Sequence, residues 1–196
     1  MLINSHKNVV DYGKIKRNNF ERVKYMVSEK LLAALNDQMN YEFESANVYL
    51  AMAAYFKAES LDGFANFFLV QAEEERFHAM KFFNFINDLG QRAKVSGMAQ
   101  PNNEFSSYLN VFEEAYAHEQ SVTKRIYNLA DIALDDREHA TMNFLKWFID
   151  EQVEEEAMFD ALIQKIKRIG NDSSALYLLD DELARRVFNP IDQATN

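Results

Sequence analysis

The stretch that decides the fold is FANFFLVQAEEERFHAMKFFNFINDL, residues 64–89. Steps of three and four residues place eight of its side chains on one face of a helix, namely Phe64, Phe68, Gln71, Glu75, His78, Phe82, Phe85 and Leu89. A glutamate and a histidine therefore lie in the middle of a stripe that otherwise belongs in a protein core. The pattern predicts a long amphipathic helix with Glu75 and His78 facing the interior.

Three other segments follow the same plan, each with an acid on its apolar face. In residues 145–169 the stripe of apolar side chains contains Gln152 and Glu155 at its centre. Glu42 lies in a seven-residue repeat of apolar positions, and Glu119 is flanked by apolar residues in the same way. The sequence thus predicts an all-α bundle of four helices, each of which contributes at least one inward acid.

Buried acids at these four positions need partners. An unpartnered buried carboxylate costs several kcal/mol, whereas a whole domain is stable by only about 5–15 kcal/mol. The acids could be protonated or paired with distant Lys or Arg, but a bound dication removes the penalty for several acids at once and explains the histidine. An oxygen-rich set with one imidazole and no thiolate suits iron or manganese. We therefore expect a carboxylate-bridged di-metal site, of the kind that four-helix bundles hold between facing helices.

Spacing assigns the ligands to two ions. Glu75 and His78 lie one turn apart, so both can reach one ion. The expected sets are Glu42, Glu75 and His78 for the first ion, and Glu75, Glu119 and Glu155 for the second, with Glu75 as the bridge. Where a symmetric site would repeat Glu-x-x-His, the fourth helix has Gln152 before Glu155. We therefore expect the second ion to be held more loosely, which suits a protein that passes metal onward.

The helix boundaries follow from caps and breakers. We expect helices over residues 28–58, 61–87 and 107–134, a fourth that ends at residue 169, and a short fifth over residues 174–187. Ser28 is a suitable N-cap, and Gly90 and Gly170 are suitable stops. Gly63 is expected to mark the first turn. Residues 91–105 have no helical period, and a connection of this length can cross over between parallel neighbours in a bundle.

Composition excludes several classes of protein. The chain has 196 residues, 48% of them apolar with 16 Phe, so one domain with a large core is expected. The net charge of −10 argues against nucleic acid as a partner. The absence of Cys excludes iron–sulfur clusters and disulfides and is consistent with a cytoplasmic location. No apolar run is long enough for a transmembrane helix, so no membrane association is expected.

Residues 1–25 differ from the rest, with six Lys or Arg against two acids and no apolar period. We expect a basic N-terminal extension, followed by one domain over residues 26–196. The extension fits a flexible tail, or a start codon placed upstream of the native start at Met26. Alternatively, it is a basic arm that binds an acidic surface, including that of a neighbouring subunit.

Five short motifs resemble those of the non-haem bacterial ferritins: QMNYE (38–42), EERFH (74–78), YAHE (116–119), NFLKW (143–147) and EQVEEE (151–156). Leu176 and Tyr177 open the last helix as they do in that family. The resemblance covers residues 26–187. It implies a ferritin-like four-helix bundle with a long crossover between helices two and three and a short fifth C-terminal helix, assembled as a homo-oligomeric shell of 24 subunits.

The resemblance also implies a ferroxidase centre. Its residues would be Glu42, Glu75, His78, Glu119 and Glu155, with Gln152 beside the second iron, and with Tyr49 and Trp147 nearby. Glu74, Glu151 and Glu154 match a third iron site that faces the interior of the shell, although from spacing alone a solvated acidic face is the simpler interpretation. Arg76 stands where haem-binding relatives have Met, so no haem is expected. His118 falls off the apolar stripe and is expected at the surface.

The expected function is oxidation of Fe(II) by dioxygen or hydrogen peroxide and storage of Fe(III) as a mineral inside the shell. A di-iron or di-manganese peroxidase or oxygenase on the same bundle is the first alternative. The others are a small DNA-protecting shell, disfavoured by the ligands within one subunit and by the fifth helix, and a bundle without catalytic activity.

Overall fold

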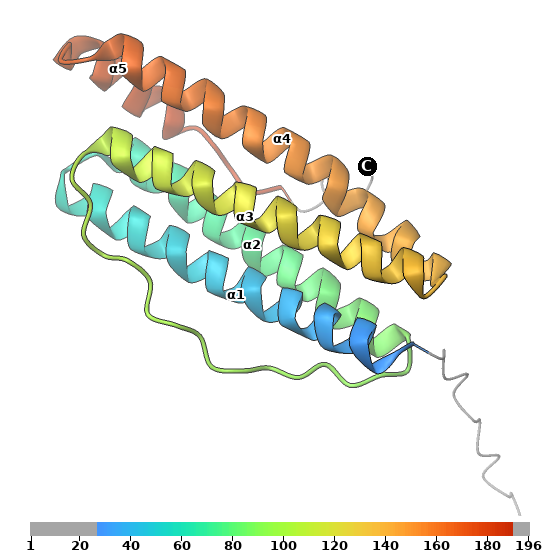
Figure 1. The fold of residues 1–196 in the computed structure, drawn as a ribbon. Helices are drawn as coiled ribbons and strands as arrows, with labels where there is room; N and C mark the ends of the chain where they lie inside the picture. Colours follow the sequence, from blue (N-terminus) through green and yellow to red (C-terminus); the bar gives the residue numbers. More distant parts are fainter. Residues whose placement is uncertain (1–26, 190–196) are drawn as a thin grey trace, which may run out of the picture.

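The computed structural model describes residues 27–189, and they form a bundle of helices without a strand (Figure 1). The helices are α1 Glu29–Ala58, α2 Asp62–Asp88, α3 Tyr108–Asp135, α4 His139–Ile169 and α5 Ser173–Leu183. Tight turns join α1 to α2 and α3 to α4, and residues 89–107 form the long crossover between α2 and α3. The all-α bundle with a crossover and a short fifth helix is confirmed. The expected basic extension over residues 1–25 lies outside the described residues.

The caps chosen from the sequence form as expected. The Ser28 hydroxyl accepts a hydrogen bond of 3.0 Å from the backbone N–H of Leu31 at the start of α1. Gly90 follows α2 with φ of 73°, and Gly170 ends α4 with φ of 55°. A residue without Cβ reaches this left-handed region at little cost, which explains why the helices end there.

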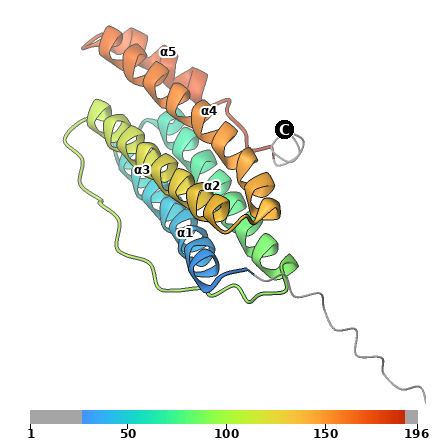
Figure 2. The ribbon, with the colours of Figure 1, turned by 45° about the vertical axis from the view of Figure 1, so that its right-hand side comes forward.

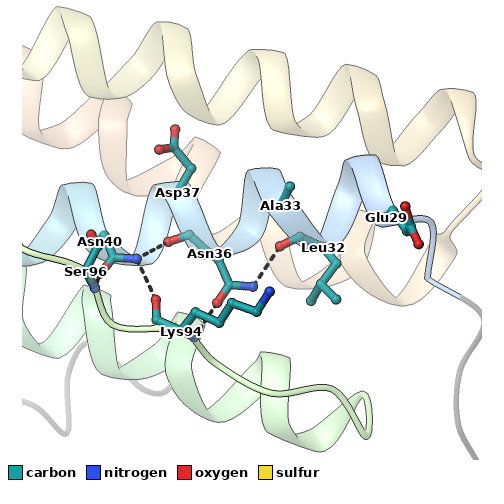
Figure 3. Close-up of a pocket in the computed structure, with 8 residues that line it drawn as sticks. All are labelled: Glu29, Leu32, Ala33, Asn36, Asp37, Asn40, Lys94 and Ser96. Carbon is teal, nitrogen blue, oxygen red and sulfur yellow. Dashed lines mark hydrogen bonds between the residues drawn. The ribbon is translucent and has the colours of Figure 1, made fainter.

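The crossover lies against the outer side of α1 in both ribbon views (Figures 1 and 2). Two asparagines of α1 hold it in place (Figure 3). Asn36 Oδ1 accepts a hydrogen bond of 2.6 Å from the Lys94 N–H, and Asn40 binds the Lys94 carbonyl and the Ser96 N–H, each at 2.8 Å. These side chains satisfy backbone groups of an extended segment that has no strand partner.

The fifth helix ends earlier than predicted, at Leu183 rather than Val187. Asn66 of α2 explains the difference. Its Nδ2 donates to the carbonyls of Leu183, Ala184 and Arg186, at 3.1, 3.3 and 2.9 Å. Carbonyls that would otherwise accept from a further helical turn are satisfied by this amide, and the chain continues along α2.

Gly63 has a different role from the one expected. The positive φ in the α1–α2 turn belongs to Ser60, at 59°, whereas Gly63 lies in the first turn of α2 beneath α5. Asp180 of α5 accepts hydrogen bonds from the N–H groups of Gly63 and Phe64, at 2.8 and 3.0 Å. A Cβ on Gly63 would lie 1.7 Å from the Asp180 carbonyl oxygen. Only glycine therefore allows this approach.

The Gly63→Ala variant is expected to lose about 1–3 kcal/mol of stability, because the added methyl group overpacks a contact with backbone and pushes α5 away. Amide hydrogen exchange over residues 173–183 and thermal melting would measure the effect. Gly97→Ala is the matched control, since no atom lies within 4 Å of a Cβ there. Equal exchange of α5 in the two variants would contradict the proposed role of Gly63.

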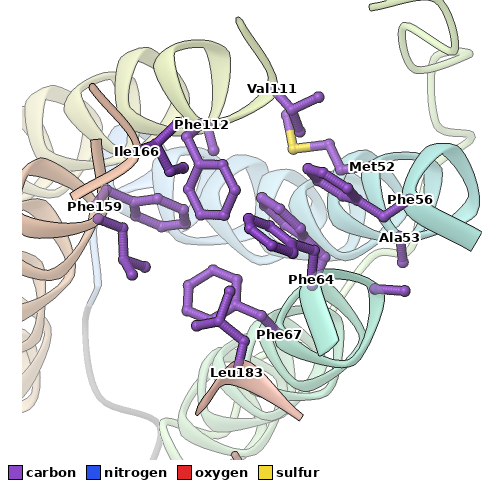
Figure 4. Close-up of a cluster of buried hydrophobic side chains, with 14 of the residues drawn as sticks. Met52, Ala53, Phe56, Phe64, Phe67, Val111, Phe112, Phe159, Ile166 and Leu183 are labelled. Carbon is purple, nitrogen blue, oxygen red and sulfur yellow. The ribbon is translucent and has the colours of Figure 1, made fainter. Parts of the chain in front are cut away.

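Two apolar clusters fill the bundle, one at each end. The first lies under α5 and is rich in phenylalanine; Figure 4 shows the rings of Phe56, Phe64, Phe67, Phe112 and Phe159 facing one another between the helices. The second contains Leu35, Phe82, Ile126 and Phe148 among others. Every one of the four long helices contributes to both clusters. Glu42, Glu75, Glu119 and Glu155 lie between the two clusters, and we call the level of the bundle that holds them the polar layer.

Candidate metal centre

The polar layer contains the residues predicted for the two-ion site, and all of them are buried. Exposed fractions are 0% for Glu42, Tyr49 and Glu119, and 2 to 5% for Glu75, His78, Gln152 and Glu155. They come from all four long helices, with α1 supplying Glu42 and Tyr49, α2 Glu75 and His78, α3 Glu119, and α4 Gln152 and Glu155. The packing of apolar stripes thus brings side chains that are far apart in sequence to one depth in the core.

Three of these residues form a compact donor group. One ligand atom each from Glu42, Glu75 and His78 lies within 4.8 Å of the other two. Glu42 Oε2, Glu75 Oε2 and His78 Nε2 are buried and have no hydrogen-bond partner. The His78 ring packs against the Trp147 ring, with centroids 5.3 Å apart. Trp147 therefore lies beside this group, where it was expected. Buried polar atoms normally have hydrogen-bond partners. Glu75 Oε2 lies 3.6 Å from His78 Nδ1, beyond hydrogen-bond distance, so three ligand residues that each bury an atom without a hydrogen bond indicate a cation site.

The second set of acids is already satisfied by neutral donors. Glu119 accepts hydrogen bonds from the Tyr49 hydroxyl and from Gln152 Nε2, the latter at 2.9 Å. Glu155 Oε2 accepts a 2.9 Å hydrogen bond from Gln71 Nε2. A cation at Glu119 and Glu155 would have to compete with these bonds. The two halves of the layer are therefore unequal.

Sequence reasoning missed the roles of two glutamines. Gln71 was placed on the inward stripe but given no role, and Gln38 was quoted only as the first residue of the QMNYE motif. Gln38 Nε2 donates to Glu42 Oε1 at 2.8 Å, and Gln38 is 2% exposed. Both glutamines were detectable in principle, because Gln38 precedes Glu42 by four residues and Gln71 precedes Glu75 by four residues, on the same helical faces.

Electrostatics disfavours ionisation of the four acids. Burial is the largest cause and raises the pKa of Glu42, Glu75, Glu119 and Glu155. Repulsion adds to burial: the charge of Glu75 raises the pKa of Glu42, and the charge of Glu119 raises the pKa values of Glu75 and Glu155. Buried carboxylates that repel one another bind either protons or metal cations.

Known proteins share both the sequence and the fold. The family model of the Ferritin-like domain matches residues 32–169. The bacterial non-heme ferritin of Staphylococcus aureus (strain MRSA252) is 54% identical over 164 residues, which cover 84% of this chain and 99% of the relative. That of Staphylococcus saprophyticus is 52% identical, covering 84% and 98%. The chain belongs to the ferritin family.

Solved ferritin structures share the fold of this chain. The open pore ferritin of Archaeoglobus fulgidus superposes with a TM-score of 0.81 at 46% identity, over 82% of this chain and 99% of that one. A closed form engineered from the Archaeoglobus fulgidus ferritin superposes with a TM-score of 0.82 at 46% identity, over 83% and 99%. Ferritins store iron, and ferroxidase activity is typical of them, so the family assignment confirms the expected function at this level. No helix within residues 27–189 is long and apolar enough to cross a membrane.

The acids matched to a third iron site lie outside the donor group of this ferritin. Glu74 is buried beside Glu75 and pairs with Arg186 Nη2 at 2.6 Å, while Glu151 is half-buried and Glu154 is exposed. Arg186 comes from the segment after α5, and its guanidinium also lies 4.5 Å above the Phe67 ring. This cation leaves no local signal in the sequence, because Arg186 reaches Glu74 across 112 residues of chain.

The expectation for His118 was wrong. The side chain is partly buried between α1 and α3, with a hydrogen bond of 2.7 Å to Ser45 Oγ and its ring stacked on Tyr41 at 5.4 Å. The Tyr41 ring of α1 covers His118 at the edge of the apolar face of α3, which explains why His118 is partly buried. Burial and the charge of Arg125 lower the pKa of His118 to about 4, so the imidazole is neutral at neutral pH.

Proposed function

We propose that this ferritin oxidises Fe(II) at an intrasubunit di-iron centre. Glu42, Glu75 and His78 would bind one Fe(II), and Glu75, Glu119 and Glu155 the other, with Gln152 beside the second. The observation that carries the proposal is the compact donor group of Glu42, Glu75 and His78, each of which buries one ligand atom without a hydrogen-bond partner. Carboxylate oxygens with one imidazole are ligands that suit iron.

The chemistry needs two electrons from two substrate ions. Each Fe(II) loses one electron, and dioxygen with two protons gives hydrogen peroxide; with hydrogen peroxide as oxidant, two electrons and two protons give two waters. The protein supplies placement. The charges of Glu119 and Glu155 act on Glu75, which supports a bridging position. The Tyr49 hydroxyl donates a hydrogen bond to Glu119, and one apolar cluster lies on each side of the layer. Protons held by the buried acids would leave as Fe(II) binds.

The two sets of iron ligands differ in how strongly they would hold an ion, and this difference favours release of oxidised iron over its retention at the centre. A cation bound by Glu119 and Glu155 replaces hydrogen bonds from Tyr49, Gln152 and Gln71, whereas a cation bound by Glu42 and His78 takes up oxygen and nitrogen atoms that lack partners. The second ion therefore gains less on binding. We propose that oxidised iron leaves the centre and accumulates as hydrated Fe(III) oxide inside a shell of 24 subunits.

Aerobic addition of Fe(II), followed by particle sizing and iron counting, tests this function. A storage shell takes up many iron ions per subunit and shows a large hollow particle. A di-iron or di-manganese peroxidase or oxygenase, the alternative on this bundle, would keep only stoichiometric metal and form no mineral. Failure to bind or oxidise iron would leave a bundle without catalytic activity.

We also propose a third iron site at Glu74, Glu151 and Glu154, on the side where α2 and α4 meet the C-terminal segment. Iron there would compete with Arg186 for Glu74.

We further propose that the folded domain begins at residue 26 and that the protein is located in the cytoplasm. The matched family region begins at residue 32, and the helical bundle begins with the Ser28 cap.

Replacing Glu151 and Glu154 together by Gln is expected to leave the first rapid phase of Fe(II) oxidation within about twofold of the wild type, because neither side chain belongs to the buried donor group. Oxygen consumed per iron, measured with an electrode, and later turnover should change. Asp150→Asn with Asp160→Asn is the matched control, since both acids are exposed on the same helix. Loss of the first phase would place Glu151 or Glu154 in the di-iron centre.

A further inference from the structure

A chain of hydrogen bonds leads from the surface of the bundle to Glu42. Arg125 of α3 donates from Nη2 to Asp37 Oδ2 at 2.6 Å and from Nε to Gln38 Oε1 at 3.0 Å. Gln38 in turn donates from Nε2 to Glu42 Oε1 at 2.8 Å. Arg125 thus reaches a proposed iron ligand through one amide, across the contact between α3 and α1.

The direction of these bonds is fixed by what each group can donate. A guanidinium has only donors, so Gln38 must turn its carbonyl oxygen toward Arg125. The Gln38 NH₂ group then faces Glu42, where it donates to a carboxylate oxygen. Without Arg125 the amide has no such constraint, because its two ends are nearly the same size and shape.

Arg125 is itself held firmly. Its guanidinium lies 4.0 Å from the centre of the Tyr41 ring, and its side chain is 30% exposed. The Tyr41 hydroxyl donates to Ser121 Oγ at 3.2 Å, which fixes the ring. A planar cation that is stacked on a ring and hydrogen-bonded through two nitrogens has little rotational freedom. It is a rigid support for the glutamine that it contacts.

The effect at the far end is on which oxygen of Glu42 is available. Oε1 is occupied by the Gln38 amide, whereas Oε2 is buried without a hydrogen-bond partner. Glu42 belongs to the compact donor group with Glu75 and His78. We propose that Arg125 is a positioning residue for iron binding: it orients Gln38 so that Glu42 is anchored through Oε1 and presents Oε2 to the first Fe(II). This inference rests on the proposed role of Glu42 as a ligand.

Partners that orient a metal ligand typically change metal affinity by about 10–100-fold when they are removed. We therefore expect Arg125→Met to weaken binding of the first Co(II) per subunit by about tenfold. Anaerobic titration of the whole assembled protein, followed by the visible absorption of Co(II), measures this without iron oxidation. Arg92→Met is the matched control, because Arg92 is exposed in the crossover; it should bind as the wild type does.

A double-mutant cycle separates orientation from charge. If Arg125 acts through Gln38, then Gln38→Leu alone and Gln38→Leu with Arg125→Met should lose the same affinity, within about twofold. Arg125→Lys, which keeps a donor, should recover most of the affinity that Arg125→Met loses. Additive losses in the double variant would show that Arg125 acts as a distant charge, and wild-type affinity in Arg125→Met would show that it does not act on the site; either result overturns the proposal.

Glu75→Ala distinguishes this inference from the function on which it rests. If the wild type binds Co(II) and Glu75→Ala does not, the metal site stands, and an unaffected Arg125→Met rejects only the positioning role. If the wild type binds no Co(II), or Glu75→Ala binds as tightly as the wild type, the proposed centre itself is wrong. Circular dichroism melting of each variant confirms that the bundle is folded.

Discussion

Changing Glu75 to Ala should slow the rapid phase of Fe(II) oxidation by on the order of 100-fold, because the two irons of the proposed centre would lose their shared ligand and would no longer react as a pair. Stopped-flow absorbance after aerobic mixing with Fe(II) gives the rate. Glu73→Ala is the matched control, since Glu73 lies two residues away on the same helix but is exposed. The control should oxidise iron at the wild-type rate.

The shell should survive this substitution. Glu75 is 2% exposed, burial and the charge of Glu119 raise its pKa, and its removal relieves repulsion in the polar layer. That relief offsets the packing lost with the side chain. Particle size and melting temperature test assembly independently of oxidation. An unchanged initial rate would refute the assignment of Glu75, and loss of assembly would show that Glu75 is chiefly structural.

Local signals explain how much of this fold could be predicted. The inward stripe of residues 64–89 depends only on helical geometry, so Glu75 and His78 were placed correctly before any tertiary contact was known. Ser28 as a cap and Gly90 and Gly170 as stops are equally local, since each acts on backbone within a turn. The buried acids were predictable for the same reason, because an apolar stripe must face the core.

Contacts between distant segments could not be predicted. Asp180 meets Gly63 across 117 residues, and Asn66 sets the end of α5 across a similar distance, so neither leaves a local pattern. Arg186 reaches Glu74 in the same way. Gln38 could have been placed beside Glu42 from its spacing, but the direction of its amide depends on Arg125 of α3, which only the packed bundle reveals.

The metal-free protein should lose stability as pH rises, relative to a variant that lacks one buried acid. Burial raises the pKa of Glu42 well above its ordinary value, with the charge of Glu75 as the second cause. Between its ordinary and raised pKa values, the folded state holds a proton that the unfolded state has released, so unfolding becomes more favourable with rising pH. Glu42→Gln removes this contribution of Glu42 to the pH dependence of stability, and it keeps an oxygen that can accept the hydrogen bond from the Gln38 amide.

The comparison should be made over about pH 5 to about pH 9, where ordinary carboxylates are ionised in the unfolded chain. The lowered pKa of His118 has the opposite effect, since its stabilisation is lost below the ordinary histidine pKa, but it is common to both proteins and cancels. Melting temperatures of metal-free wild type should fall relative to Glu42→Gln as pH rises. Parallel curves would mean that Glu42 ionises as easily in the fold as in the open chain.

A divalent cation should reverse the trend. Zn(II) cannot be oxidised, and binding to the folded state alone stabilises a protein by about 2.7 kcal/mol at a hundred times its dissociation constant. Because the cation competes with protons for Glu42 and Glu75, its affinity should increase with pH over the range in which the metal-free protein weakens. The stabilisation should be lost in Glu75→Ala and kept in Glu73→Ala. Equal stabilisation of both variants would place the bound cation elsewhere. A transient iron centre requires buried acids that destabilise the protein when no cation is bound and stabilise it when a cation binds.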